Sequence, residues 1–139
     1  MPEDYHFELG KATVIREGED VTLIGSGIMV SRCKEAAEIL RGRGISAEVI
    51  NVSTIKPLDT ETIIRSASKT KHVVTAENST VIGGLGGAVA EVLSEECPVK
   101  MRRIGIKDRF GHSGLIDELL EIYNLTTGDI VKKALEVLG

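Results

Sequence analysis

The sequence predicts an α/β fold in which helices cover both faces of a mostly parallel sheet. Short apolar runs alternate along the chain with segments whose apolar residues recur at helical spacing, and this alternation is typical of parallel sheets. The length of 139 residues suits one domain with a single core. Aromatic residues make up only 3% of the chain. We therefore expect a core of Val, Ile, Leu and Ala, the residues that fill buried parallel strands.

Five segments are predicted to be strands because they are short, apolar and bounded by turn residues. They are residues 12–16, 21–24, 47–52, 72–76 and 99–106. The first two are separated only by the turn residues 17–20, so the local sequence favours a hairpin between them. The last carries Lys100, Arg102 and Arg103, and such charges suit the edge of a sheet, where they discourage pairing between molecules.

Five further segments are predicted to be helices because their apolar residues recur on one face. The first begins near Ser31, places Cys33 and Leu40 on its apolar face, and ends at Gly42 and Gly44. The others begin after Asp59, within the glycine-rich residues 83–87, near Ser113 and near Thr127. The right-handed crossover rule for parallel strands then determines most of the topology.

Composition argues against several classes of protein. The net charge of −4 disfavours a nucleic-acid partner, which requires a basic face. No apolar run approaches the length of a membrane span, and the acidic residues 1–4 do not resemble a signal peptide. They resemble a linker with a start codon in front of it, so we expect a domain cut from a longer protein. Cys33 and Cys97 lack the spacing of metal ligands, and we expect reduced thiols in a cytoplasmic protein.

Three loops follow the carboxyl ends of predicted strands, where open parallel sheets bind ligands. They are residues 25–27, 51–54 and 77–80. The glycine-rich residues 83–87 open a helix whose free N–H groups could hold an anion, or they could serve only a tight turn and close packing on the sheet. Glu77 also has two interpretations: a functional carboxylate in a crevice, or the hydrogen-bonding partner of a helix N-terminus or an interface.

Familiar catalytic and nucleotide-binding motifs are missing or incomplete. The dinucleotide-binding pattern fails twice, because Val30 and Val89 stand where Gly or Ala is required. The sequence contains neither a phosphate-binding P-loop nor a nucleophile elbow. His6, His72 and His112 are scattered along the chain, and only His112 lies in a loop with potential partners. We therefore expect no metal ligands and no self-contained catalytic set.

Seven short runs, spread in order over almost the whole chain, together resemble one family. They are residues 5–12, 21–27, 55–59, 76–78, 83–91, 108–114 and 125–127. The most diagnostic is the run from Ala76 to Asn78 followed by the glycine-rich residues 83–87. The set is similar to the C-terminal domain of transketolase-like, thiamine-diphosphate-dependent enzymes.

This resemblance implies a three-layer α/β/α fold with a five-stranded mixed sheet, in which the first short strand is antiparallel to the rest. That strand would lie at the edge beside residues 47–52, not in a hairpin with residues 21–24. Residues 1–10 would be a linker from a missing pyrimidine-binding domain, and residues 11–139 would be the domain itself. The strand order would reverse between residues 21–24 and 72–76, which places a crevice there. Candidate residues for this crevice, for an anion site or for an interface are Ser26, Gly27, Glu77, Asn78, Gly83, Gly84, Gly86 and His112.

The resemblance also implies a function. The whole enzyme would be a transketolase, which transfers a two-carbon ketol unit between sugar phosphates, as in the pentose phosphate pathway. Other domains would bind thiamine diphosphate and Mg, because the diphosphate-binding motif and the pyrimidine-binding domain are absent from this sequence. No catalytic or cofactor-binding residue carries over to this chain, which would support domain and dimer assembly. Its partners would be the cofactor-binding domains or subunit of the same enzyme, in a homodimer or a heterotetramer.

Other assignments stay open. One is the C-terminal domain of a 2-oxoacid dehydrogenase beta subunit or of deoxyxylulose-phosphate synthase, and another is a free-standing regulatory module that binds a small anion. Glu77 and Asn78, with the glycine-rich residues 83–87, resemble transketolase more closely, and several prokaryotes encode transketolase as two chains. His112 departs from the family pattern, in which an acidic residue is more usual.

Overall fold

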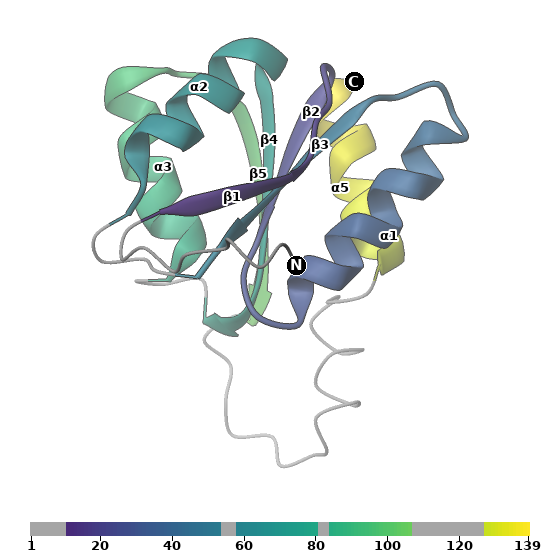
Figure 1. Cartoon of the computed structure of the whole chain (residues 1–139), viewed down its shortest axis with the longest axis horizontal. Coiled ribbons are helices and arrows are strands. Elements are labelled where there is room, and N and C mark those ends of the chain that lie inside the picture. The colour runs from purple at the N-terminus through teal and green to yellow at the C-terminus, as the bar shows by residue number, and fades with distance from the viewer. Residues whose placement is uncertain (1–10, 54–57, 81–83, 107–126) are drawn as a thin grey trace, which may run out of the picture.

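The computed structural model describes residues 11–53, 58–80, 84–106 and 127–139. Within them, five strands form one sheet in the order β1-β3-β2-β4-β5 (Figure 1). The strands are β1 (Ala12–Arg16), β2 (Val21–Gly25), β3 (Ala47–Val52), β4 (His72–Thr80) and β5 (Lys100–Ile106). β1 runs antiparallel to β3, whereas the other neighbouring strands are parallel. The mixed sheet that the resemblance implies is confirmed.

The prediction of a hairpin between the first two strands is wrong, because β1 pairs with β3. β2 has parallel neighbours on both sides, β3 and β4, so it has no free edge for β1. The connecting residues 17–20 instead pass over the start of β3, where the Gly18 N–H donates to Glu48 Oε1 at 3.1 Å. A Cβ atom added at Gly18 would lie 2.2 Å from the carbonyl carbon of Ala47. Glycine at position 18 therefore lets the connection between β1 and β2 pass close to the backbone of β3.

Helices cover both faces of the sheet. α1 (Met29–Arg41) and α5 (Thr127–Leu138) lie on one face, and α2 (Thr60–Thr70) and α3 (Leu85–Glu96) lie on the other (Figure 1). None of the helices in the described ranges is long and apolar enough to cross a membrane. The arrangement confirms the predicted three layers.

Each face of the sheet buries its own apolar cluster. Leu23 of β2 and Leu40 of α1 belong to the cluster beneath α1 and α5. Ile24 of β2 and Ile63 of α2 belong to the cluster beneath α2 and α3. Because successive side chains of a strand point to opposite faces, the neighbours Leu23 and Ile24 enter different clusters. An apolar strand such as β2 therefore requires a central position, with helices above and below it.

Most predicted boundaries lie close to those observed, and β4 is the main exception. The sequence predicts a loop at residues 77–80, but β4 continues through Thr80. Thr80 pairs with Ile106 of β5 after a shift in register. The end of β5 therefore provides the pairing partner for the extension of β4. β5 forms the edge of the sheet, as its charged residues predicted. The helix predicted near Ser113 lies outside the described residues.

Candidate functional site

The predicted crevice lies at the carboxyl ends of β2 and β4, where the strand order reverses. Gly25 pairs with Ala76 at these ends, and the N–H of Ser26 donates to the carbonyl oxygen of Ala76 at 3.4 Å. Gly27 follows with φ of 60°, a conformation that favours glycine, and the chain then enters α1. The structure therefore brings Ser26 and Gly27 to the residue that precedes Glu77.

Glu77 is the buried carboxylate of this crevice, with only 1% of its surface exposed. Its Oε1 accepts a hydrogen bond from the N–H of Leu85 at 2.8 Å, and its Oε2 accepts one from the N–H of Gly86 at 2.7 Å. These donors belong to the first turn of α3, whose N-cap is Gly84 and has no side chain to serve as a cap. A carboxylate there also interacts favourably with the positive end of the helix dipole. The structure thus favours the helix-capping interpretation of Glu77.

The glycine at position 86 has a packing role. A Cβ atom added to Gly86 would lie 2.7 Å from Arg103 Cδ and 3.1 Å from Thr75 Oγ1. The small residue lets α3 approach β4 and β5 closely, so that its N–H groups reach Glu77. The two N–H groups that were considered for an external anion therefore donate to a carboxylate of this chain.

The remaining candidates have mixed outcomes. Gly84 is placed as the N-cap of α3, beside Glu77. The backbone of Asn78 continues β4. Gly83 and His112 lie outside the described residues. The structure therefore gathers Ser26, Gly27, Glu77, Gly84 and Gly86 around the ends of two strands and the start of one helix.

Sequence reasoning missed the role of Asp59, which holds two elements together. Its Oδ1 accepts the N–H of Thr62 at 3.2 Å, so Asp59 caps α2. Its Oδ2 accepts the Thr62 hydroxyl at 2.7 Å and the N–H of Ala12, the first residue of β1, at 2.9 Å. An Asp three residues before Thr62 is a recognisable N-cap signal. The bond to Ala12 has no such signal, because it spans distant parts of the sequence.

The carboxyl group of Asp59 is stabilised in its charged form. Burial by itself would raise its pKa. Hydrogen bonds from the Ala12 N–H and from Thr62, together with the charge of Lys11, outweigh burial, and the pKa lies below its ordinary value. Asp59 therefore acts as a charged acceptor where the chain enters the sheet.

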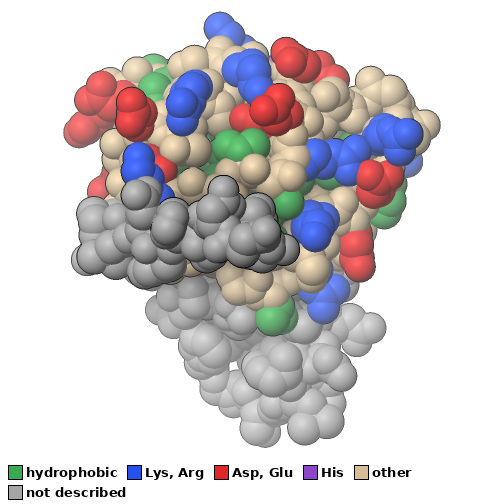
Figure 2. All heavy atoms as spheres, in the orientation of Figure 1, with side chains coloured by type: hydrophobic (Ala, Val, Ile, Leu, Met, Phe, Trp, Pro, Cys, Tyr) green, Lys and Arg blue, Asp and Glu red, His purple; other side chains and the backbone are tan. Residues whose placement is uncertain are grey.

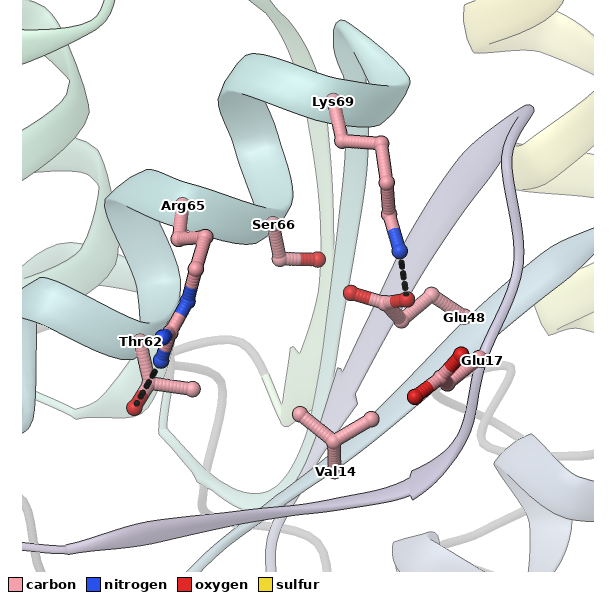
Figure 3. Close-up of a pocket in the computed structure, with 7 residues that line it drawn as sticks. All are labelled: Val14, Glu17, Glu48, Thr62, Arg65, Ser66 and Lys69. Carbon is pink, nitrogen blue, oxygen red and sulfur yellow. Dashed lines mark hydrogen bonds and ion pairs between the residues drawn. The ribbon is translucent and has the colours of Figure 1, made fainter.

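A second concave region, which was not predicted from the sequence, runs along α2 beside the β1 edge of the sheet (Figure 3). We call it the α2 hollow; its volume is about 460 Å³, and it is lined by Val14, Glu17, Glu48, Thr62, Arg65, Ser66 and Lys69. Burial would raise the pKa of Glu48, but hydrogen bonds from Lys69, Ser66 and Gly18 outweigh it and lower the pKa. The visible surface in Figure 2 mixes acidic and basic side chains with small hydrophobic areas between them.

Two features that could hold a diphosphate and its metal ion are absent or already used among the described residues. A group of three or more His, Cys, Asp or Glu side chains placed to hold a metal does not occur among them. The N-terminal turn of α3, a feature that can bind a diphosphate, already donates to Glu77. Among the described residues, the crevice therefore presents backbone groups and the Glu77 carboxylate, which accepts two N–H groups of α3.

The two cysteines differ in their environments. Cys33 is fully buried in the cluster beneath α1, and burial raises its thiol pKa to about 12. Cys97 is half-buried at the end of α3, and its Sγ lies 3.4 Å from Ser68 Oγ. Neither forms a disulfide bond with a described residue.

We expect a thiol reagent to modify Cys97 in the folded protein and to leave Cys33 unmodified, because the thiolate is the reactive form. Titration with a chromogenic disulfide should give one fast thiol per chain in buffer, and both cysteines should react in denaturant. The Cys97→Ser variant should lose the fast phase. Rapid modification of Cys33 in that variant, under native conditions, would contradict the buried environment.

Known proteins are similar to this chain over most of its sequence. Residues 10–130 match the family described as transketolase, C-terminal domain. The 6-deoxy-6-sulfo-D-fructose transketolase subunit SqwH of a Clostridium species (strain MSTE9) is 56% identical over 135 residues, which are 97% of this chain and 42% of that protein. A transketolase C-terminal section from Methanocaldococcus jannaschii is 47% identical over 135 residues, which are 96% of this chain and 42% of that protein.

A solved structure agrees with these relatives. It is described as a split-gene transketolase, an inactive beta4 tetramer, and matches this fold with a TM-score of 0.93 and 46% sequence identity. The match covers 99% of this chain and 45% of that chain, so this chain spans less than half the length of the proteins it resembles. Both the sequence and the fold of this chain match these proteins over nearly all of its length. The chain belongs to the transketolase C-terminal domain family.

Proposed function

We propose that this chain is the C-terminal section of a transketolase and that it supports subunit and domain assembly rather than the chemical step. The observation that carries the proposal is the use of Glu77: the buried carboxylate of the crevice accepts the N–H groups of Leu85 and Gly86. These hydrogen bonds support a role for Glu77 in organising α3 rather than in catalysis. Family membership and the names of the relatives support the assignment to a transketolase.

Exposed apolar side chains support an assembly role. Within the described ranges, the large ones lie on β1 and around α1, and they are Val14, Ile15, Ile28 and Ile39. Between 38% and 48% of the surface of each is exposed. Contact with the other domains or the partner subunit would bury Ile15, Ile28 and Ile39 and remove apolar surface from water. A homodimer or a heterotetramer of the complete enzyme would provide such contacts.

In this proposal the complete enzyme binds thiamine diphosphate and Mg²⁺ on its other domains or subunit. The cofactor supplies the carbanion chemistry of ketol transfer when it is bound, while the protein positions it. The same parts of the enzyme would select the sugar. The Clostridium relative is named for a sulfonated fructose, and we expect the corresponding cofactor-binding partner to determine whether this chain serves a similar sugar.

Calorimetry of the isolated chain with thiamine diphosphate and Mg²⁺ should give no binding heat, because we expect the cofactor site on the other domains or subunit. Adding the cofactor-binding chain from the same genome should produce both binding and ketol transfer. Micromolar cofactor binding by this chain alone would overturn the proposal.

The same mixture distinguishes the alternatives. A synthase of deoxyxylulose phosphate would consume pyruvate, and a 2-oxoacid dehydrogenase component would decarboxylate a 2-oxoacid, whereas a transketolase would convert a ketose phosphate and an aldose phosphate. A free-standing anion-binding module would instead bind inorganic phosphate without any partner chain. Each of these results, in place of ketol transfer, would contradict the transketolase assignment.

A further inference from the structure

The α2 hollow is large enough for a small molecule. Its volume of about 460 Å³ lies within the range of small-molecule sites. One wall is the face of α2 that carries Thr62, Arg65, Ser66 and Lys69, and the opposite wall comes from β1, β3 and the β1–β2 connection (Figure 3). The hollow lies over the β1–β3 side of the sheet, whereas the crevice lies between β2 and β4.

Most polar groups in the α2 hollow are already satisfied. Glu48 is 3% exposed and accepts hydrogen bonds from Lys69 Nζ and from the Gly18 N–H. The Thr62 hydroxyl donates to Asp59, and Ser66 Oγ lies 2.7 Å from Thr22 Oγ1. These groups shape the hollow, but their hydrogen-bonding capacity is used inside the protein. Recognition of a ligand would have to come from other side chains.

Among the charged side chains that line the hollow, Arg65 and Glu17 form no ion pair with a described residue. Arg65 forms one contact there, a long hydrogen bond of 3.4 Å from its Nη2 to Thr62 Oγ1. Glu17 forms neither a hydrogen bond nor an ion pair with a described residue, and it contributes with Glu19 to the raised pKa of Lys69. Figure 3 shows Arg65 near one end of the hollow and Glu17 at the other, with Val14 between them. Their opposite charges therefore do not neutralise each other.

We infer that the α2 hollow binds a small zwitterion, whose anionic group contacts Arg65, whose ammonium group contacts Glu17, and whose apolar middle lies over Val14. A guanidinium group can bind a carboxylate through two parallel hydrogen bonds, which gives the anionic end a defined orientation. Lys69 and Glu48 at the other end already pair with each other, so the Glu17 carboxylate is the group there that suits an ammonium group. Val14 is 39% exposed and provides the apolar contact. This inference is independent of the proposed transketolase function.

The probe that tests the inference is ε-aminocaproate, a zwitterion with an apolar spacer, titrated into the uniformly ¹⁵N-labelled 139-residue chain. Caproate and hexylamine, at matched ionic strength, each retain one charged end. We expect amide shifts confined to residues lining the α2 hollow, with a dissociation constant on the order of 1 mM for the zwitterion because both charged contacts are exposed. Each one-ended probe should bind about fivefold more weakly.

Charge-removing variants identify which end each group contacts. Arg65→Gln should weaken zwitterion binding about fivefold and leave hexylamine unaffected, and Glu17→Gln should do the same while leaving caproate unaffected. Arg43→Gln and Glu95→Gln remove the same charges from exposed positions outside the hollow and should change nothing. Both test positions are exposed, so the variants should fold normally.

Three results would overturn the inference. The first is equal binding of the zwitterion and either one-ended probe. The second is a set of shifts centred outside the α2 hollow. The third is the absence of shifts at probe concentrations far above the expected dissociation constant. If none of these results is found, a series of shorter and longer ω-amino acids would define the spacing between the two charged contacts.

Discussion

Replacing Glu77 with Ala is expected to lower the free energy of unfolding by about 3 kcal/mol. The substitution removes a side chain that is 1% exposed and leaves the N–H groups of Leu85 and Gly86 without their acceptors. It also removes a negative charge from the N-terminus of α3. Loss of buried volume, of two hydrogen bonds and of the charge all act in the same direction.

Urea unfolding followed by circular dichroism measures this loss. Glu77→Gln should cost about half as much, because the amide oxygen still accepts one N–H while the NH₂ group cannot accept the other. Glu91→Gln, at an exposed position on the same helix, is the matched control and should cost less than about 0.5 kcal/mol. A Glu77→Ala variant as stable as this control would show that the cap contributes little.

The Glu77 variants also separate assembly from chemistry. In the complete transketolase that we propose, Glu77→Ala should weaken association with the proposed cofactor-binding partner, because α3 loses its fixed start. At saturating partner concentration the turnover of the assembled enzyme should be largely retained. Loss of the chemical step in a fully assembled complex would show that Glu77 takes part in the reaction.

Asp59→Ala is expected to lower the free energy of unfolding by about 2–3 kcal/mol. The carboxylate caps α2 through Thr62 and also accepts the N–H of Ala12, so the substitution affects a helix and an edge strand together. Asp59→Asn should cost less, since Asn is also a good N-cap. Glu61→Gln, in the exposed first turn of the same helix, is the control and should be nearly neutral.

The pH dependence of stability tests the charge on Asp59. Its pKa in the folded protein lies below the ordinary value of 3.8, so its contribution is present above that value and is lost as the pH falls through the folded pKa. The stability difference between the unmodified chain and Asp59→Asn should therefore shrink as the pH is lowered below about 4. The pKa of Glu48 is also lowered and adds acid sensitivity of the same sign, which the paired comparison cancels. A difference that does not change with pH would contradict the charged-acceptor role.

The elements of this fold could be predicted because their signals are local. The alternation of apolar strands with amphipathic helices follows from side-chain periodicity over a few residues, and the charges of β5 indicated an edge. The resemblance to a family added the edge position of β1. The apparent hairpin turn was misleading, because turn residues do not reveal that β3 lies between β1 and β2.

The candidate site could be predicted only in part. The crevice at the ends of β2 and β4 follows from a general property of parallel sheets. Whether Glu77 faces a ligand or caps a helix depended on the position of α3, which follows from packing at Gly86. The bond from Asp59 to Ala12 and the α2 hollow join residues that are far apart in the sequence.

The sequence by itself determined the fold class, the order of strands and helices along the chain, and the family resemblance. The tertiary structure alone decided which groups those residues contact, and hence that Glu77 caps α3 and that Arg65 and Glu17 stay apart. The physical reason is the range of the interactions. Periodicity and turn chemistry act between near neighbours, whereas hydrogen bonding and burial depend on which distant segments pack together.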